Sequence, residues 1–149
     1  MKKIVFMAAA IALSFVTLSC ATNKEYTQDE VNTAFEKVYD KYVSSLILDG
    51  AKTYQVVEKD TLSAITVKYY GSDKGYYFPV IMLASSDVVL DPDLIKPGMK
   101  LTVPDLQKNL DNPASRAKMK SFFKEIATVY QKKGNLFIRD KLNEIADSL

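Results

Sequence analysis

The chain has 149 residues, a formal net charge of +2 and no histidine. That length accommodates one compact domain with helical additions, and so small a net charge gives no reason to expect nucleic acid as a partner. Without histidine, Ser-His and Cys-His nucleophile pairs and histidine-bearing zinc sites are excluded. Nothing in the sequence indicates a metal site or a cofactor.

Residues 1–19 are typical of a secretory signal. Lys2 and Lys3 precede an apolar run over residues 4–16. As a helix this run would span roughly 20 Å, too short for a bilayer core of about 30 Å. The only cysteine, Cys20, follows directly and resembles the acceptor of a bacterial lipoprotein signal. We therefore expect a lipid on Cys20 that anchors the chain in a membrane; ordinary secretory cleavage after Ala21 is the alternative.

Residues 20–52 are expected to form a tether and an N-terminal helix. Thr27 and Glu30 have the spacing of a capping box, and we expect the helix to end near Leu48. Its apolar stripe could dock another protein, but packing against the rest of the chain is the simpler interpretation. The stripe consists of Val31, Phe35, Val38 and Tyr42.

The first half of the central segment, residues 53–104, predicts a strand followed by a helix. Alternating side chains at residues 54–57 indicate a short, half-buried strand. Asp60 is placed to be the N-cap of a helix over residues 61–70. Gly71 can take the left-handed conformation that closes this helix.

The second half of this segment predicts a helix followed by a strand. The helix is expected over residues 78–85, with Pro79 in its first turn. Pro97 and Gly98 suit the middle of a type II turn. A closing strand then ends at Pro104.

Residues 105–149 are expected to be mostly helical. A polar link is predicted after Pro104, before a long helix opened by Asn112 and Pro113 and a last helix over residues 136–148. The apolar face of the long helix includes Phe122, Phe123, Ile126 and Tyr130.

Residues 53–104 resemble a LysM domain, a small sugar-binding module of cell-wall proteins. The likeness rests on the opening strand, on Asp60 to Ser63, on Tyr69 to Gly71, and above all on the closing half, residues 91–104. The resemblance implies an α+β fold: a βααβ module with a two-stranded antiparallel sheet and two helices. Here N- and C-terminal helices would flank it.

The resemblance also implies a shallow groove for acetamido sugars between two loops. We name them the first loop (residues 59–63) and the second loop (residues 85–97). Backbone N–H and C=O groups can pair with an acetamido group, while apolar side chains cover its methyl and the sugar faces. The implied glycan-binding residues are Lys59, Asp60, Thr61, Leu62, Ser63, Ser85, Ser86, Ile95 and Pro97.

Two positions depart from the family pattern. Lys59 stands where many members have glycine, and Ser85 stands where many have asparagine. Lysine is disfavoured there if φ is positive. We therefore expect weak binding, and we expect Lys59→Gly with Ser85→Asn to strengthen it.

The function predicted from these features is non-catalytic binding of peptidoglycan or a chitin-like glycan. The protein would be a membrane-anchored lipoprotein of the bacterial cell envelope, facing the periplasm or wall. The alternative is a protein-interaction scaffold whose LysM fold has lost glycan binding and whose partner is an envelope protein. An enzyme is not expected, because the four carboxylates that could form an acid/base pair are more simply a helix cap and turn residues. They are Asp60, Asp73, Asp91 and Asp93.

Overall fold

The fold is mixed helix and strand, as expected. A computed structural model describes residues 25–149, so the predicted signal segment and Cys20 lie outside the described residues. Within residues 25–149 there are six α-helices and a two-stranded sheet. The elements are α1 (Gln28–Tyr42), β1 (Lys52–Gln55), α2 (Leu62–Tyr70), α3 (Phe78–Ala84), β2 (Lys100–Val103), α4 (Leu106–Asp111), α5 (Pro113–Lys132) and α6 (Leu136–Ser148). In this part of the chain, no helix has the length and apolar character needed to cross a membrane.

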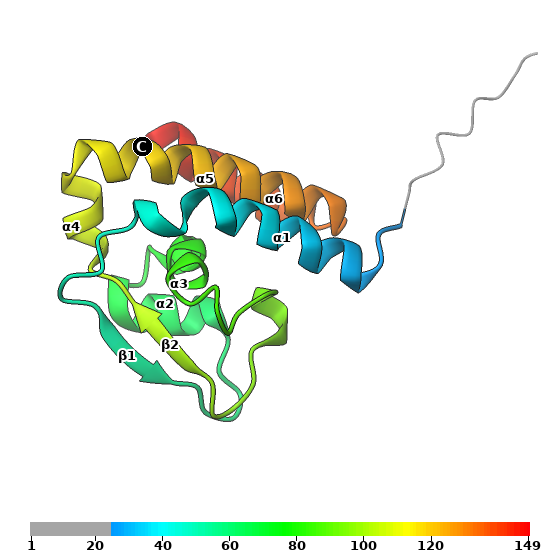
Figure 1. Cartoon of the computed structure of the whole chain (residues 1–149), viewed down its shortest axis with the longest axis horizontal. Helices are drawn as coiled ribbons and strands as arrows, with labels where there is room; N and C mark the ends of the chain where they lie inside the picture. The colour runs from blue at the N-terminus through cyan, green and yellow to red at the C-terminus, as the bar shows by residue number, and fades with distance from the viewer. Residues whose placement is uncertain (1–24) are drawn as a thin grey trace, which may run out of the picture.

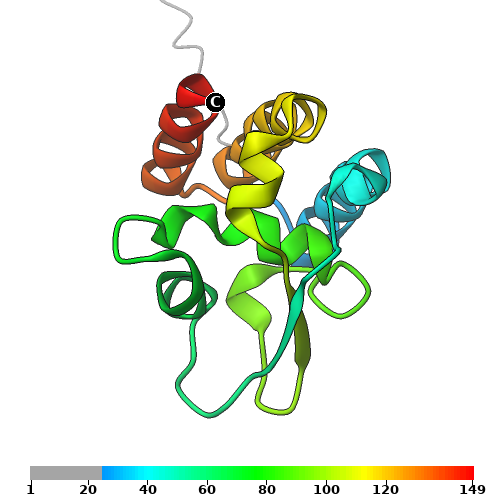
Figure 2. The ribbon, with the colours of Figure 1, turned by 90° about the vertical axis from the view of Figure 1, so that its left-hand side faces the viewer.

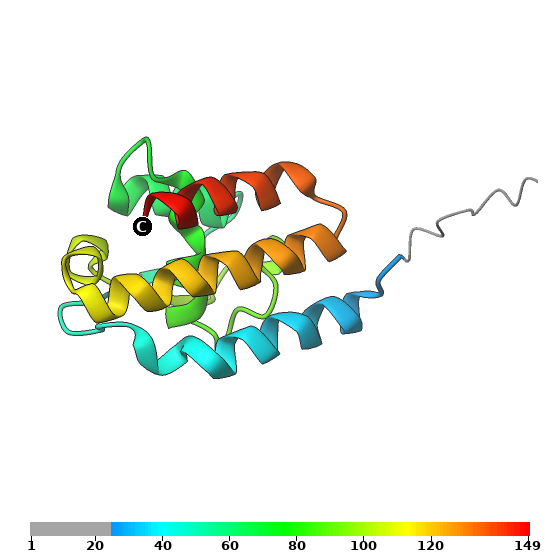
Figure 3. The same cartoon turned by 90° about the horizontal axis from the view of Figure 1, so that it is seen from above.

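The elements form two layers (Figure 1). Helices α1, α5 and α6 run side by side in one layer, as Figure 3 shows from above. The sheet, α2 and α3 form the other layer. Strand β1 pairs antiparallel with β2, with Lys52 opposite Val103 and Gln55 opposite Lys100. The chain leaving β1 and the turn entering β2 therefore lie next to one another at one end of the sheet (Figure 2).

Helix α1 starts where its capping box predicts. The Thr27 hydroxyl accepts a hydrogen bond from Glu30 N–H at 3.2 Å, and the Glu30 carboxylate accepts one from Thr27 N–H at 2.9 Å. The helix ends at Tyr42, earlier than expected, because a short 3₁₀ turn (Val43–Ser45) follows it. The Ser45 hydroxyl donates to the Tyr42 carbonyl at 2.6 Å and so satisfies an acceptor that a continuing helix would use.

The apolar stripe of α1 packs inside the molecule. Phe35 is completely buried, with its ring centroid 6.0 Å from that of Tyr130 in α5. Tyr42 meets Phe122 of α5 at 5.6 Å. The simpler interpretation of this stripe is confirmed.

The N-cap of α2 is Thr61, and the prediction of Asp60 was wrong by one residue. The Thr61 hydroxyl accepts a hydrogen bond from Ala64 N–H at 3.2 Å. The Asp60 carboxylate instead accepts from Val57 N–H at 2.9 Å and from the Tyr54 hydroxyl at 2.7 Å. Lys59 has a positive φ of 70°, which folds the chain into a tight turn and directs Asp60 back toward β1.

The expected polar link after Pro104 is largely a helix, α4, which the sequence analysis missed. The Asp105 carboxylate caps it by accepting from Lys108 N–H at 3.0 Å. The Asn109 side chain is completely buried. Its amide oxygen accepts a hydrogen bond from Ile47 N–H at 2.8 Å, and its amide nitrogen donates one to the Ile47 carbonyl at 3.0 Å. Helix α4 is too short for a clear hydrophobic period, so long-range contacts stabilise it. By contrast α5, with Asn112 as its N-cap, and α6 begin as predicted.

Candidate functional site

The first and second loops meet around one groove of about 240 Å³. The sequence-predicted residues that line it are Asp60, Thr61, Leu62, Ser63 and Ile95. Its other lining residues are Phe78, Pro92, Asp93, Tyr130 and Ile138. The structure thus brings together five of the nine residues predicted to contact a glycan.

The remaining four predicted residues do not line this groove. Lys59 and Pro97 are exposed in the turns beside it, and Ser86 is half-buried after α3. Ser85 is only 1% exposed. We therefore treat Lys59, Ser86 and Pro97 as neighbours of the groove.

Ser85 joins α3 to the sheet. Its hydroxyl accepts a hydrogen bond from Thr102 N–H at 2.8 Å and lies 3.3 Å from the Thr102 carbonyl, to which it donates. Because the side chain is buried and its hydrogen-bonding groups are occupied, it has no surface to offer a ligand. The prediction of Ser85 as a contact residue is corrected to a role in positioning the second loop.

Main-chain hydrogen bonds connect the residue that follows β1, before the first loop, to the turn that follows the second loop and leads into β2. Val56 N–H donates to the Met99 carbonyl and Gly98 N–H donates to the Val56 carbonyl, both at 2.9 Å. Gly98 has a φ of 92°, and Met99 N–H donates to the Lys96 carbonyl at 3.1 Å, as the predicted type II turn requires. The segments that flank the two loops at this end of the sheet are therefore held together.

Asp60 fixes the first loop through its carboxylate. Hydrogen bonds from Val57 N–H and then from the Tyr54 hydroxyl hold the pKa of Asp60 below its ordinary value. The same contact raises the pKa of Tyr54. At neutral pH the carboxylate is charged and the phenol is protonated, which keeps the turn closed at the mouth of the groove.

The second loop is fixed by a buried ion pair with the far end of α5. The Asp91 side chain is 1% exposed, and its two oxygens lie 2.7 and 2.8 Å from Lys133 Nζ. Lys133 Nζ also donates to Asp93, and Gln28 Nε2 of α1 donates to Asp91 at 2.9 Å. Burial disfavours the charged form of Asp91, but the hydrogen bonds from Lys133, Asp93 N–H and Gln28 prevail and lower its pKa.

The C-terminal helices supply one wall of the groove. Tyr130 of α5 and Ile138 of α6 both line it. The Tyr130 ring packs edge-on against Phe78 at a centroid distance of 6.0 Å. Neither residue was predicted to line the groove, because both lie outside residues 53–104, the segment to which the resemblance confined it. The apolar face of α5 indicated burial but not which side chain would reach the groove.

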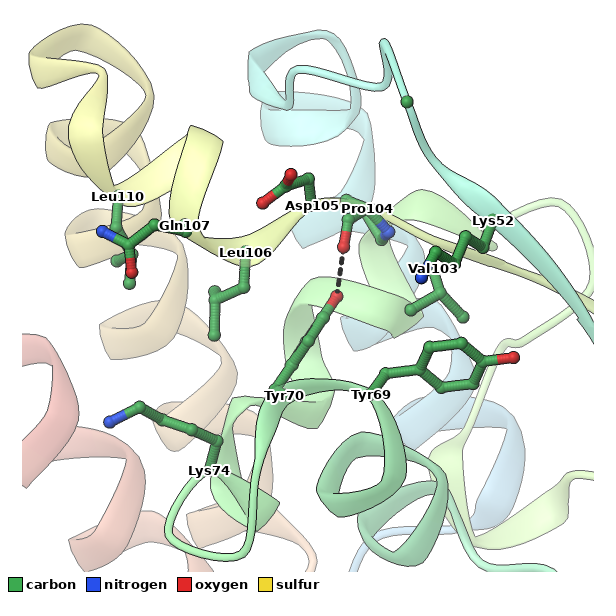
Figure 4. A pocket seen from close by; sticks show the side chains of 11 residues that line it. Lys52, Tyr69, Tyr70, Lys74, Val103, Pro104, Asp105, Leu106, Gln107 and Leu110 are labelled. Atoms are coloured by element: carbon green, nitrogen blue, oxygen red, sulfur yellow. Dashed lines mark hydrogen bonds between the residues drawn. The ribbon is translucent and has the colours of Figure 1, made fainter.

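A second pocket, of about 290 Å³, lies at the opposite end of the sheet (Figure 4). Figure 4 shows Tyr70 pointing at the Pro104 carbonyl, to which its hydroxyl donates at 3.0 Å. Burial, and then the charge of Asp105, raises the pKa of Tyr70, so the phenol remains a neutral donor at neutral pH. Leu106 and Leu110 of α4 form one side of this pocket. None of the predicted site residues lines it, and its hydrogen bond attaches α2 to the chain leaving β2.

The groove combines a polar rim with an apolar floor, which suits non-covalent binding of a ligand that has both kinds of surface. Its two carboxylates are engaged: Asp60 by Tyr54 and Val57, and Asp93 by Lys133 at 2.7 Å. Over residues 25–149 no cluster of three acidic, histidine or cysteine side chains could hold a metal ion. The chain matches no protein-family model, no curated protein and no solved structure.

Proposed function

We propose that this protein is a LysM-type lipoprotein that binds N-acetylglucosamine-containing glycan in the bacterial cell envelope. The glycan would be peptidoglycan or a chitin-like polymer, and the protein would bind it without catalysing a reaction. One observation carries the proposal. The loops that the LysM resemblance marks for glycan contact are far apart in the sequence, yet Asp60 to Ser63 and Ile95 line the same groove.

The order of elements within residues 53–104 supports the LysM assignment. The chain passes from β1 through α2 and α3 to β2, and the two strands pair antiparallel. This order is compatible with the βααβ arrangement that the resemblance implies. It places the first loop directly before α2, while the second loop follows α3 and leads to β2.

The chemistry of the groove suits an acetamido sugar. Ile95, which is half-buried, provides apolar surface for the methyl group and a sugar face above the buried Leu62, and the exposed Thr61 and Ser63 provide polar groups at the rim. A groove this small implies modest affinity. A lipid on Cys20 would compensate, because each buried CH₂ contributes about 0.8 kcal/mol to membrane binding, and anchoring raises the effective concentration of the groove near the wall.

The proposal is tested with the soluble form that starts at Ala21. We expect it to sediment with purified peptidoglycan. Titration with chitin oligomers should shift backbone amides in the first loop and around Ile95. Shifts confined to α4 and its surroundings, or no binding to intact peptidoglycan, would contradict the proposal.

A pair of neighbouring residues separates a groove effect from general damage. Ile95 is half-buried and lines the groove, whereas Leu94 is 45% exposed and does not line it. Ile95→Ser should weaken glycan binding, and Leu94→Ser should leave it unchanged. Equal effects of the two variants would count against the groove as the binding site.

Anchoring is tested separately in cells. Cys20→Ala should release the protein from the membrane fraction while export continues. Retention of the exported variant in the membrane would contradict the prediction that a lipid on Cys20 anchors the protein.

The second candidate function is a protein-interaction scaffold in the cell envelope. It is favoured by Lys59, which adopts a positive φ of 70° at a position where many members of the family have glycine. Failure of peptidoglycan binding together with recovery of a defined envelope protein after cross-linking in cells would favour this candidate.

A further inference from the structure

Phe137 is the most exposed large hydrophobic residue in the described part of the chain, with 62% of its surface accessible. It lies in the first turn of α6, directly before Ile138, which lines the groove. Its ring packs edge-on against the ring of Tyr76, with centroids 6.1 Å apart and planes at 72°. An exposed aromatic ring is thus held in a defined orientation, one residue before a side chain that lines the groove.

Tyr76 reaches the same place from another part of the chain. It belongs to a 3₁₀ turn (Gly75–Tyr77) that leads into α3, and Phe78, two residues later, lines the groove. The Tyr76 ring is half-buried. No residue among 25–149 hydrogen-bonds to its hydroxyl, and no buried side-chain polar atom there lacks a partner, so this hydroxyl faces solvent.

The groove is too small to enclose a glycan polymer, so part of such a ligand would contact the surface around it. Small-molecule sites typically enclose about 300 to 1,000 Å³, and the groove, at about 240 Å³, is smaller. A glycan polymer seated in it must therefore continue over the adjoining surface. An aromatic ring offers the C–H face of a sugar a large apolar contact at little conformational cost, and a free phenolic hydroxyl can pair with a sugar hydroxyl.

We infer that Phe137 and Tyr76 form an additional sugar subsite, which continues the groove and binds the next residue of the same glycan chain. The inference rests on the proposed function. It assigns part of glycan recognition to α6, outside the LysM-like segment. It also implies that the protein discriminates long glycans from short ones, because only a chain longer than the groove reaches Phe137.

The test compares oligomer lengths. Affinities of the soluble form for a chitin disaccharide and for a chitin oligomer long enough to leave the groove are measured by titration. Phe137→Ala should weaken binding of the long oligomer by roughly two- to tenfold, the scale of one aromatic contact. It should leave the disaccharide affinity unchanged, and Phe137→Trp should preserve the preference for length.

The matched control is Leu48→Ala. Leu48 is 45% exposed, lies between α1 and β1 in the chain, and does not line the groove. It should change neither affinity. The thermal unfolding midpoint of each variant should stay close to that of the wild type, which would show that the substitution leaves the fold intact.

Two results would overturn the inference while leaving the proposed function intact: equal affinity of wild type and Phe137→Ala for the long oligomer, or equal losses for both lengths. If Phe137→Ala instead abolishes self-association in sedimentation, the surface formed by Phe137 and Tyr76 binds a second copy of the chain. If it abolishes binding to phospholipid vesicles, this surface binds a membrane. The inference fails in both cases. If the wild type binds neither oligomer nor intact peptidoglycan, the proposed function fails and the subsite fails with it.

Discussion

The ammonium group of Lys133 lies 2.7 and 2.8 Å from the two carboxylate oxygens of Asp91, across 42 residues of sequence. Asp91 belongs to the second loop, and Lys133 follows directly after α5. The pair therefore connects the C-terminal helices to the loop that forms one side of the groove. It makes the position of this loop dependent on a residue outside residues 53–104, at the C-terminal end of α5.

Removing the lysine should strongly destabilise the fold. Lys133→Met leaves the Asp91 carboxylate buried with only neutral partners, and breaking a buried pair in this way costs about 3 kcal/mol or more. Urea unfolding followed by circular dichroism measures the free energy of unfolding. Lys141→Met is the control, because Lys141 pairs with Glu144 at the surface, and exposed pairs contribute about 1 kcal/mol at most. Similar losses for the two variants would show that the Asp91 pair has no special role.

The same pair predicts how stability depends on pH. The pKa of Asp91 is lower in the folded state than its ordinary value, so the unfolded chain binds a proton more readily than the folded chain. The stabilisation is complete above the ordinary aspartate pKa of about 3.9 and is lost as pH falls through the lower folded-state pKa. The free energy of unfolding of the wild type should therefore fall steeply below about pH 4.

The variant that checks this pH dependence is Asp91→Asn, which keeps the shape of the side chain but cannot ionise. Its unfolding free energy should start lower and change less between neutral and acidic pH. An unchanged slope in Asp91→Asn would assign the acid sensitivity to other carboxylates, such as Glu125, whose pKa is also lowered.

Replacing Lys59 by glycine should stabilise the folded protein. It is the only non-glycine residue with positive φ among residues 25–149. A non-glycine side chain in this conformation destabilises the folded state by about 1 to 2 kcal/mol. Replacing it by glycine removes this strain, but the greater conformational freedom of glycine stabilises the unfolded chain by about 0.4 to 1 kcal/mol. Lys59→Gly should thus raise the free energy of unfolding by up to about 1.6 kcal/mol. Glu58→Gly, at the preceding exposed position with negative φ, should lower it; a loss in both variants would contradict strain at Lys59.

Ser85 and Ser86 offer a matched comparison. Ser85→Ala leaves Thr102 N–H buried without its acceptor, which costs about 1 to 3 kcal/mol. Ser86 is half-buried and no described residue hydrogen-bonds to its side chain, so Ser86→Ala should stay within about 0.5 kcal/mol. Thermal unfolding of both variants measures the difference. The expected benefit of Ser85→Asn is withdrawn, because a larger side chain in this closed space should overpack it by about 1 to 3 kcal/mol.

The features that the sequence predicted correctly are mainly local. Thr27 and Asn112 cap their helices through hydrogen bonds to residues two or three positions away, and Gly98 turns the chain by its own φ. The convergence of Leu62 and Ile95 was predicted only through the LysM resemblance. Helices α2 and α3 separate these two residues in the sequence, and no local sequence pattern predicts that positions so far apart come together.

The features that were missed depend on contacts that helix and strand periodicity does not reveal. The Asp60 cap was wrong because Tyr54 and Val57 compete for its carboxylate. Helix α4 depends on Asn109, whose partner Ile47 lies 62 residues away. The wall formed by Tyr130 and Ile138 depends on how α5 and α6 pack, which periodicity alone does not determine.

The C-terminal helices contact residues 53–104 through an aromatic pair between α5 and the turn before α3. Phe123 of α5 is completely buried, and its ring meets that of Tyr77 at a centroid distance of 5.7 Å. Phe123→Ala removes this contact and leaves a cavity between the two layers. It should lower the free energy of unfolding by about 3 to 5 kcal/mol, measured by urea unfolding.

The control for this variant is Phe137→Ala, which removes the same atoms from a ring that is 62% exposed. It should change the free energy of unfolding by no more than about 0.5 kcal/mol. If the two layers unfold together, Phe123→Ala should shift circular dichroism and tyrosine fluorescence to the same lower urea midpoint. Separate midpoints, or a loss below about 0.5 kcal/mol, would mean that α5 does not stabilise the groove-bearing layer. The wall formed by Tyr130 and Ile138 would then be free to move away from the loops.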